Sequence, residues 1–398
     1  MSDFDSRSFD LFAPTPEHAL FRETLREFTE REVEPQAAAH DRAEKFNHAL
    51  FKRAGELGFL GVTLPAEYGG SGLDASAAVL LYEELCSSDP GFGLAVLAHS
   101  VLFAQNLAVN GSAEQKQRVL PKAASGEFVC GMCMTEPSVG TDVMAMKTRA
   151  RRDGDLYVLD GTKTFITNGG IDDSTLGDAF VVYAATGERS LSSFLVEKGM
   201  PGFRLGQKWR DKLGMRASFT AELVFDGVRV PLANRLGEEG QGALQMMRNL
   251  EVERLTIAGM SLGIARRAIA IMTDWANQRV SYGVPIREHG QVQRYIAESY
   301  AEWSAARAFT YDVARRIDLA ATGQRVAADA AKLFTVQMAK RAADAAIQVL
   351  GGYGYMGENV VERLWRDSKL LEIGGGTLEA HHKNMTKDIA RDPARYLR

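Results

Sequence analysis

The 398-residue sequence has little of several features that mark particular classes of protein. Its three cysteines, Cys86, Cys130 and Cys133, cannot build a disulfide framework in a chain of this length, and they are typical of a reducing compartment such as the cytosol. Its 47 Lys and Arg residues against 51 Asp and Glu leave no basic excess, which disfavours a nucleic-acid binder. With seven histidines in all, and no third ligand spaced suitably from His381 and His382, we predict no metal site.

Long hydrophobic runs are also missing. Charged residues or glycines interrupt the apolar stretches well short of a bilayer span, so we predict no membrane segment. The acidic, polar N-terminus resembles neither a signal peptide nor an Arg-rich transit peptide, which again favours the cytosol. The length exceeds what one hydrophobic core usually supports, so we expect two or three domains.

The residue pattern changes twice along the chain. Thr15 and Pro16 are typical of a helix start, and Ala/Leu-rich periodic segments follow, so residues 1–128 are predicted to be an all-α domain. Short β-rich runs punctuated by Gly, Asp and Asn predict a central antiparallel β domain over 129–239. Long helical patterns near 243–279, 289–317 and 324–350 predict a second α domain over 240–398. The fold class is α+β, and the seam between the second and third domains is the expected ligand site.

Two short motifs have better structural than functional explanations. Gly352, Gly354 and Gly357 satisfy the dinucleotide pattern G-x-G-x-x-G, but a predicted helix precedes them where the nicotinamide-binding fingerprint needs a strand. They are typical of a helix C-cap and turn, which could still contact a ligand. Cys130 and Cys133 have C-x-x-C spacing within a β-like run, which favours two buried thiols over a redox pair.

Several longer blocks carry a resemblance over nearly the whole chain. They are LGFLGVTLP (57–65), MTEPSVGTD (134–142), KTFITNGG (163–170), KLGMRASFTAE (212–222), RVSYGVPI (279–286), QVLGGYG (348–354) and VERLWRD (361–367). In this order they resemble the acyl-CoA dehydrogenase family, and several ordered blocks are stronger evidence than one short pattern. The resemblance implies an N-terminal helical domain, a central antiparallel β domain and a C-terminal four-helix bundle. It also implies a homotetramer built as a dimer of dimers, with an electron-transfer flavoprotein as the electron acceptor.

The resemblance further implies FAD between the β and C-terminal domains, with its adenine end reached by a neighbouring subunit. The expected cofactor residues are Met132, Met134, Thr135, Phe165 and Thr167 at the flavin, Thr141 at the pyrophosphate or pantetheine, Arg279, Tyr282, Gln348, Gly351 and Gly352 across the dimer, and Thr377 and Glu379 as further contacts. Hydroxyls and backbone N–H groups can hold the ring's polar edge while apolar side chains cover its face. Met132, Phe165 and Gly290 stand where the family usually has an aromatic residue, Trp and Gln, respectively. The Gly290 change puts one subunit-interface flavin contact in question, although Gln291 and Gln293 lie beside it.

The catalytic base is the most informative position. Oxidation of an acyl-CoA needs a base for the α-proton as a hydride leaves Cβ, and a carboxylate in a dry pocket is suited to this. Most family members place a Glu before a Gly-Thr near the C-terminus, where this chain has Gly375 in EIGGGT (372–377). The isovaleryl-CoA and long-chain types instead place the Glu directly before an Arg on the first long C-terminal helix. That position is Glu253, which we predict to be the base.

Two neighbours of Glu253 are predicted to bind substrate. Arg254 is expected to anchor the pantetheine-CoA arm. Glu251 lies about 200° around the helix from Glu253. The resemblance makes Glu251 a CoA hydrogen-bond partner, while an i, i+3 ion pair with Arg254 on a solvated helix face is nearly as good an interpretation.

The substrate is predicted to be a short- or branched-chain acyl-CoA. Gly374 and Gly375, in place of a bulky residue and a carboxylate, open space for a methyl branch and match the isovaleryl-type pattern, which implies branched-chain amino acid catabolism. The same space could admit a longer or terpenoid chain such as citronellyl-CoA, because one methyl group is worth only about 1–3 kcal/mol of discrimination. The same fold also suits an acyl-CoA oxidase or desulfinase. It further suits a non-enzymatic DNA-binding relative of the alkylation-response branch, which the net charge of −4 disfavours.

Overall fold

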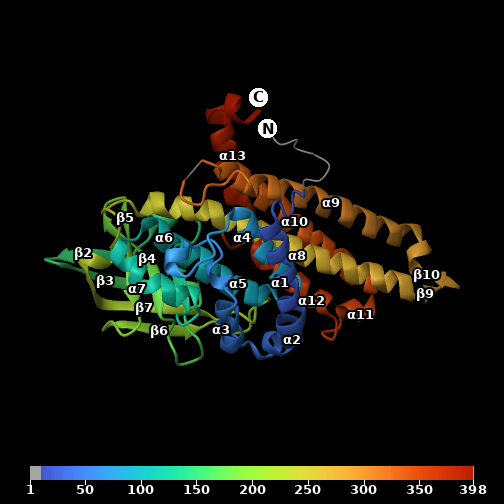
Figure 1. The fold of residues 1–398 in the computed structure, drawn as a ribbon, viewed down its shortest axis with the longest axis horizontal. Coiled ribbons are helices and arrows are strands. Elements are labelled where there is room, and N and C mark those ends of the chain that lie inside the picture. The colour runs from blue at the N-terminus through green and yellow to red at the C-terminus, as the bar shows by residue number, and fades with distance from the viewer. Residues whose placement is uncertain (1–9, 322, 398) are drawn as a thin grey trace.

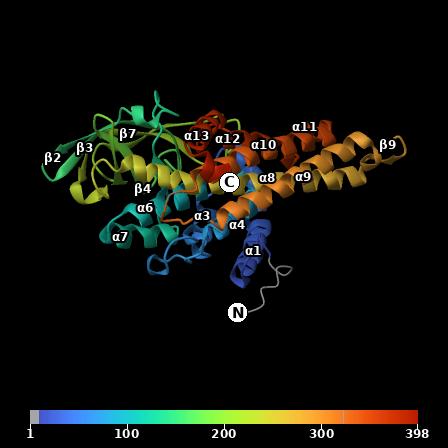
Figure 2. The same cartoon turned by 90° about the horizontal axis from the view of Figure 1, so that it is seen from above.

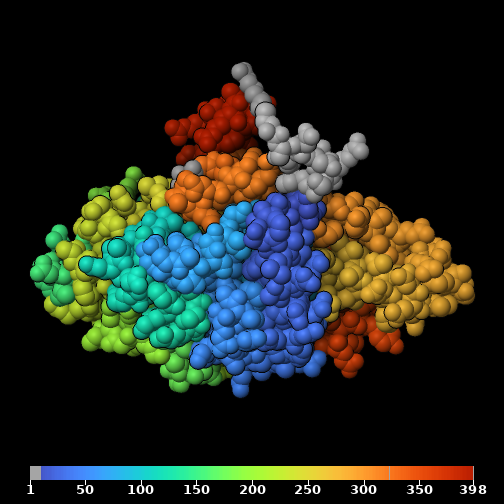
Figure 3. All heavy atoms as spheres, in the orientation of Figure 1, coloured from blue at the N-terminus to red at the C-terminus, as the bar shows by residue number. Residues whose placement is uncertain are grey.

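The computed structural model describes residues 10–321 and 323–397. Figure 1 shows the large sheet at one end of an elongated molecule and a short pair of strands at the other. Three long helices extend toward that second end: α8 (Gly242–Gln278), α9 (Gly290–Ala314) and α10 (Arg325–Leu350). Seen from above, α8 runs nearly the whole length between these ends (Figure 2). The N-terminal third covers one face where the sheet meets the long helices (Figure 3). This order of helical, β and helical regions is the predicted one, although the boundaries 1–128, 129–239 and 240–398 stay predictions.

The first region is helical throughout, as expected. Thr15 caps the first helix by accepting a hydrogen bond from the His18 backbone N–H, and Pro16 is its first residue. The elements are α1 (Pro16–Phe28), η1 (Thr29–Val33), α2 (Glu34–Ala43), α3 (His48–Glu56), η2 (Phe59–Gly61), η3 (Ala66–Tyr68), α4 (Ala75–Leu85), α5 (Pro90–Leu97), η4 (Ala98–Gln105), α6 (Asn106–Asn110) and α7 (Ala113–Ala124). Every residue of α4 is buried, so this helix belongs to the interior of the molecule.

Within the described residues, the second region forms one eight-stranded sheet in the order β6-β7-β3-β2-β4-β5-β8, with β1 paired to β4. The elements are β1 (Cys130–Cys133), η5 (Val143–Ala145), β2 (Arg149–Asp153), β3 (Leu156–Thr167), β4 (Ala179–Gly187), β5 (Ser190–Glu197), β6 (Phe203–Lys208), β7 (Thr220–Pro231), η6 (Leu232–Asn234) and β8 (Arg235–Leu236). Most pairs are antiparallel, as predicted. The exceptions are β1 and β2, which both run parallel to β4.

The third region is a bundle in which α10 contacts α8, α9 and α12. The elements are α8 (Gly242–Gln278), β9 (Val280–Ser281), β10 (Val284–Pro285), η7 (Ile286–Glu288), α9 (Gly290–Ala314), α10 (Arg325–Leu350), α11 (Gly352–Tyr355), α12 (Val360–Leu371), α13 (Leu378–Arg391) and α14 (Pro393–Leu397). The predicted C-cap and turn is present, since α10 ends at Gly351 with φ +59° before the one-turn helix α11. One buried apolar cluster joins α4 and α5 to α8, α10 and α12, so the two helical regions share a core.

Two segments could cross a membrane by length and composition alone, Pro90–Asn110 and Gly242–Gln278. The expectation that every apolar stretch ends well short of a bilayer span was therefore wrong. In each segment 78% of the apolar window is buried inside the fold, which is typical of core helices. Cys130 and Cys133 are buried free thiols, as the C-x-x-C interpretation predicted, and burial raises the pKa of the Cys130 thiol well above its usual value. Cys86 is also a buried free thiol.

Glycines allow α8 to pack closely on α4. A Cβ added at Gly263 would lie 2.3 Å from the Glu83 carbonyl oxygen, and one at Gly259 would lie 2.9 Å from the Val79 carbonyl oxygen. Backbone cannot yield as a flexible side-chain end can, so these positions accept no side chain without separating the helices.

We therefore predict that Gly263→Ala lowers the free energy of unfolding by about 1–3 kcal/mol, despite the higher helix propensity of Ala. Calorimetric unfolding measures the effect. The control is Gly290→Ala at the start of α9, where an added Cβ meets nothing within 4 Å and stability should be unchanged or higher. Equal stability of the two variants would contradict this account of the α4–α8 contact.

Candidate active site

Glu253 lies on α8 with its side chain turned into the interior. It is only 6% exposed, and its Oε2 is buried without a hydrogen-bond partner among the described residues. Burial raises the pKa of Glu253 above the ordinary Glu value, while the positive charges of Lys332 and, less strongly, Arg254 oppose the rise. A buried carboxylate with an uncommitted oxygen and a raised pKa is suited to accept a proton.

The segment 374–376 closes one side of this position. Gly375 has φ +65°, and a Cβ added there would lie 3.3 Å from Glu253 Cδ and 2.5 Å from Ile257 Cδ1. Positions 253 and 375, the two alternative places for the catalytic Glu in the sequence comparison, therefore lie next to each other in the fold. In the chain they are 122 residues apart (375 − 253 = 122). The Glu372 carboxylate is paired, because it accepts a hydrogen bond from Lys369 Nζ at 2.6 Å.

Arg254 faces this segment too, but it is not paired with Glu251. Its Nη1 lies 2.8 Å from Asp329 Oδ1 on α10, and its Nε donates to the Gly375 carbonyl at 3.5 Å. The expected i, i+3 ion pair with Glu251 does not form, because Asp329 of the neighbouring helix takes the guanidinium in its place.

Glu251 is buried rather than solvated, with 6% of its surface exposed. Its Oε2 accepts backbone N–H bonds from Gly323 at 3.1 Å and Gln324 at 3.0 Å, on the approach to α10. It therefore faces away from Glu253, as the 200° rotation predicted, but the solvated-pair interpretation was wrong. Burial raises the pKa of Glu251, and these two N–H groups oppose the rise. Glu251 also lines a small cavity of about 90 Å³ with Gln324.

The first predicted cofactor group comes together at the edge of the sheet. The Thr164 N–H donates to the Thr135 carbonyl at 2.9 Å, which joins the chain after β1 to β3. A Cβ at Gly131 would lie 2.7 Å from the Thr167 carbonyl oxygen, so these strands are in close contact. Phe165 has φ +57° and is 61% exposed, with its ring 5.2 Å from that of Trp209.

The second group lies at the far end of α8. Arg279, Gly351 and Gly352 line one cavity of about 550 Å³. Arg279 is 26 residues beyond Glu253, which corresponds to roughly 39 Å along the helix axis. Within a single chain, this cavity is therefore remote from Glu253.

The remaining predicted residues are dispersed. Met132 is buried in the core, Met134 is half-buried after β1, and Thr141 and Gln348 are exposed. Tyr282 is 97% exposed between β9 and β10. Thr377 caps α13 by accepting from the Ala380 N–H at 3.2 Å, and Glu379 is exposed in the first turn.

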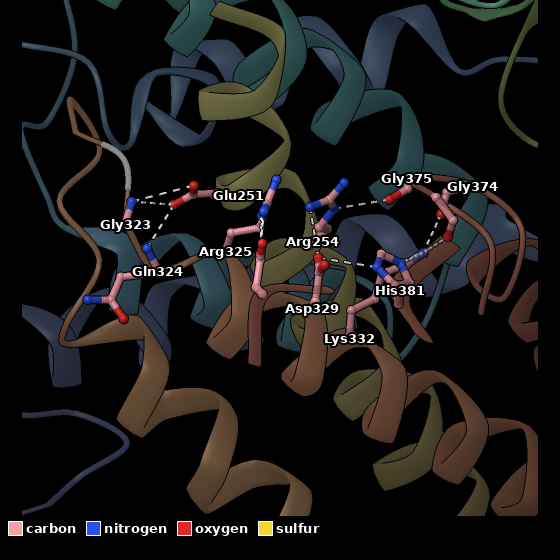
Figure 4. A network of polar contacts seen from close by, with 12 residues as sticks. Glu251, Arg254, Gly323, Gln324, Arg325, Asp329, Lys332, Gly374, Gly375 and His381 are labelled. Carbon is pink, nitrogen blue, oxygen red and sulfur yellow. Dashed lines mark hydrogen bonds and ion pairs between the residues drawn. The ribbon is translucent and has the colours of Figure 1, made fainter. Parts of the chain in front are cut away.

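Three residues near the site were not predicted. Asp329 and Lys332 of α10 and His381 of α13 are buried behind the 374–376 segment, and Figure 4 shows them with Arg254. On a helical pattern, charged residues at i and i+3 indicate a solvated face, so only the packing identifies this cluster. No group of three His, Cys, Asp or Glu side chains that could hold a metal ion was found in residues 10–321 and 323–397.

Comparisons with known proteins agree on one family. The N-terminal, middle and C-terminal domain profiles of acyl-CoA dehydrogenase match residues 15–127, 131–228 and 240–390. A mitochondrial isovaleryl-CoA dehydrogenase of Oryza sativa subsp. japonica is 38% identical over 98% of this chain and 94% of its own length. The structure of butyryl-CoA dehydrogenase from Megasphaera elsdenii superimposes with a TM-score of 0.90 at 32% identity, over 95% of this chain and 99% of that one.

A glutaryl-CoA dehydrogenase from Mycobacterium smegmatis, solved in complex with FADH2, superimposes with a TM-score of 0.90 at 29% identity, over 98% of this chain and 97% of that one. The fold and the site therefore define a flavin-dependent oxidoreductase. The chain belongs to the acyl-CoA dehydrogenase family, whose members act on a CH–CH bond of acyl-CoA.

The contact between Gly375 and Glu253 gives a testable prediction. Gly375→Ala should destabilise the protein by about 1–2 kcal/mol, because an L-residue is strained at this positive φ and its Cβ would meet Ile257. Gly374→Ala is the matched control, since its Cβ would find Leu370 at an ordinary 3.5 Å. Thermal unfolding of both variants tests this, and equal destabilisation would contradict it.

Proposed function

We propose that this protein is an FAD-dependent dehydrogenase of short- or branched-chain, isovaleryl-like acyl-CoA thioesters that forms trans-2-enoyl-CoA. The observation that carries the proposal is the buried Glu253 carboxylate, with an unpaired Oε2, beside the glycine that replaces the usual base. A base on α8 and a side chain at position 375 would compete for the same space. A Glu at position 253 is therefore consistent with a glycine at position 375.

In this proposal Glu253 Oε2 takes the proton from the substrate α-carbon. The site is dry and Oε2 has no donor to displace, so the carboxylate meets the substrate without breaking an existing hydrogen bond. The raised pKa brings the base closer to neutral pH, which strengthens it as a proton acceptor. Arg254 and Glu251 are proposed to hold the pantetheine-CoA arm. Glu251 would do so with the carboxylate lone pairs that its two backbone N–H donors do not occupy.

The residues present fit FAD. Phe165 offers an exposed aromatic face at the sheet edge, and Met134, Thr135 and Thr167 lie on the same segments. The open backbone at Gly351 and Gly352, where an added Cβ meets nothing within 4 Å, allows the close approach of a dinucleotide. When bound, the flavin supplies the acceptor for the hydride that leaves the substrate β-carbon.

A second copy of the chain is proposed to complete each cofactor site. Because Arg279 lies roughly 39 Å from Glu253 along α8, its cavity serves the FAD of a neighbouring subunit. Exposed apolar side chains surround that cavity, among them Tyr282, Val280, Tyr353, Tyr355 and Met356, as expected for a surface that pairs. The proposed assembly is a dimer of dimers. The proposed electron acceptor is an electron-transfer flavoprotein, and the proposed compartment is the cytosol, where free thiols persist.

The substrate preference rests on the space beside the α and β carbons. Gly374 and Gly375 contribute no side chain there, and Ile257 forms the nearest apolar boundary. This space fits a branch at the β-carbon. The three relatives named above act on isovaleryl-, butyryl- and glutaryl-CoA by their names, so the family alone leaves the acyl group open.

The role of Glu253 predicts that Glu253→Gln slows flavin bleaching by an acyl-CoA about 10²–10⁴-fold, because the amide cannot accept the α-proton. Anaerobic titration of the holoenzyme measures this, and binding of the thioester to the variant should persist. Glu302→Gln on α9, which changes only an exposed ion pair with Arg341, is the control. A Glu253→Gln variant that bleaches at the wild-type rate would refute the assignment.

The acyl group is tested by a panel of saturated thioesters with the wild-type enzyme. Isovaleryl-CoA or another branched short thioester should bleach the flavin faster than straight chains of the same length, by about 10-fold or more. Preference for citronellyl-CoA or a long chain would assign a terpenoid or long-chain substrate in its place. Oxygen uptake during turnover would indicate an oxidase, and no bleaching by any thioester would refute the dehydrogenase proposal.

A further inference from the structure

Lys332 is a fully buried lysine behind the 374–376 segment. Its ammonium donates to the Gly374 carbonyl at 2.6 Å and to the Gly376 carbonyl, and it lies 3.1 Å from His381 Nε2 (Figure 4). An ammonium has three hydrogens, and these three partners can take one each. Lys332 therefore ties α10 and α13 to the glycine segment, whose Gly375 lies against Glu253.

The charged groups that face Lys332 come from three elements. They are Glu253 and Arg254 on α8, Asp329 on α10 and His381 on α13. Asp329 Oδ1 lies 2.8 Å from Arg254 Nη1 and 3.2 Å from His381 Nδ1, so it is already shared between two partners. Burial lowers the pKa of His381, which favours the neutral ring that can accept at Nε2 from Lys332.

Pairing leaves one cation and one carboxylate without a direct counter-ion. Arg254 is matched by Asp329, whereas Lys332 is bound to neutral acceptors and Glu253 Oε2 is bound to nothing among the described residues. Burial lowers the pKa of Lys332, and Glu253 is the charged neighbour that opposes this most. In turn Lys332 is the charge that most opposes the raised pKa of Glu253.

We propose that Lys332 is a positioning residue for the reaction: its ammonium fixes the 374–376 segment against α8 and keeps the Glu253 carboxylate ionised in a dry site. This inference rests on the proposed role of Glu253 as the base. Lys332 touches neither substrate nor reacting atoms. It acts through the charge it places behind Glu253 and through the two carbonyls it holds.

The sign of the effect follows from the charges. Without the ammonium, the only cation that faces Glu253 is Arg254, whose charge Asp329 largely offsets. The protonated form of Glu253 is then favoured, so the pKa of Glu253 rises further. Removing the negative charge of Asp329 has the opposite sign, because Arg254 then acts on Glu253 without that offset. A purely structural role for the cluster would not displace the titration of Glu253 in opposite directions.

The experiment compares Lys332→Met and Asp329→Asn with two control variants on the same helix, Lys340→Met and Asp344→Asn. Both control residues contact the Trp365 side chain. Infrared titration of each holoenzyme follows the protonated-carboxyl band that Glu253→Gln removes, which reads Glu253 without turnover. The pH dependence of anaerobic flavin bleaching gives the second readout. For Lys332→Met we expect the band to persist to higher pH, and bleaching to be about tenfold slower at pH 6 yet within about twofold of wild type at pH 9.

Asp329→Asn should make the band vanish at lower pH, and the controls should match wild type. The proposal would be overturned if the pKa of Glu253 were unchanged in Lys332→Met. It would also be overturned if the pKa of Glu253 moved in the same direction in both variants. If Lys332→Met does not fold, Asp329→Asn decides alone. Only a lower pKa of Glu253 in that variant would support the proposal. Failure of the proposed function is distinguishable, because it would abolish wild-type bleaching or its dependence on Glu253, whereas failure of this inference leaves both intact.

Discussion

A carboxylate that must be both dry and ionised needs positive charge nearby, and the structure around Glu253 meets this constraint with few groups. Removing an ionised side chain from water without compensation disfavours the charged form strongly. Direct ion pairing would provide compensation, but it would also occupy the oxygen that must accept the proton. Here the cations lie behind and beside Glu253, and Oε2 is left without a partner among the described residues. The carboxylate is stabilised at a distance and stays available.

That arrangement depends on α8. The helix carries Glu253 and Arg254 where it passes the glycine segment, packs on α4 through Gly259 and Gly263, and ends beside the cavity lined by Arg279. Because one rigid helix of 37 residues links these places, the proposed base and the cavity for a partner subunit's cofactor are held at a fixed separation. This separation is the reason for proposing that a second chain completes the FAD site.

The sequence predicted the features that depend on local pattern and on ordered motifs. The order of helical and β regions, the cap at Thr15, the buried thiols and the opposite facing of Glu251 and Glu253 all follow from periodicity or residue chemistry, and the structure confirms them. The convergence of Gly375 and Glu253 was reachable only through the family resemblance. The Asp329, Lys332 and His381 cluster was not predictable, because Lys332 and His381 lie 49 residues apart and their contact depends on how α13 packs on α10.

Tertiary packing also explains why local spacing indicated the wrong ion-pair partner for Arg254. Spacing favours Glu251 at i, i+3, yet such pairs are worth only a few tenths of a kcal/mol on a helix surface. Once α10 packs against α8, Asp329 offers a buried carboxylate to Arg254, and Glu251 finds two backbone N–H donors that offset part of the effect of burial on its charged form. The two carboxylates of this turn are therefore separated by environment. Glu251 is held by fixed donors and Glu253 is left free, which favours a binding role for one and a proton-accepting role for the other.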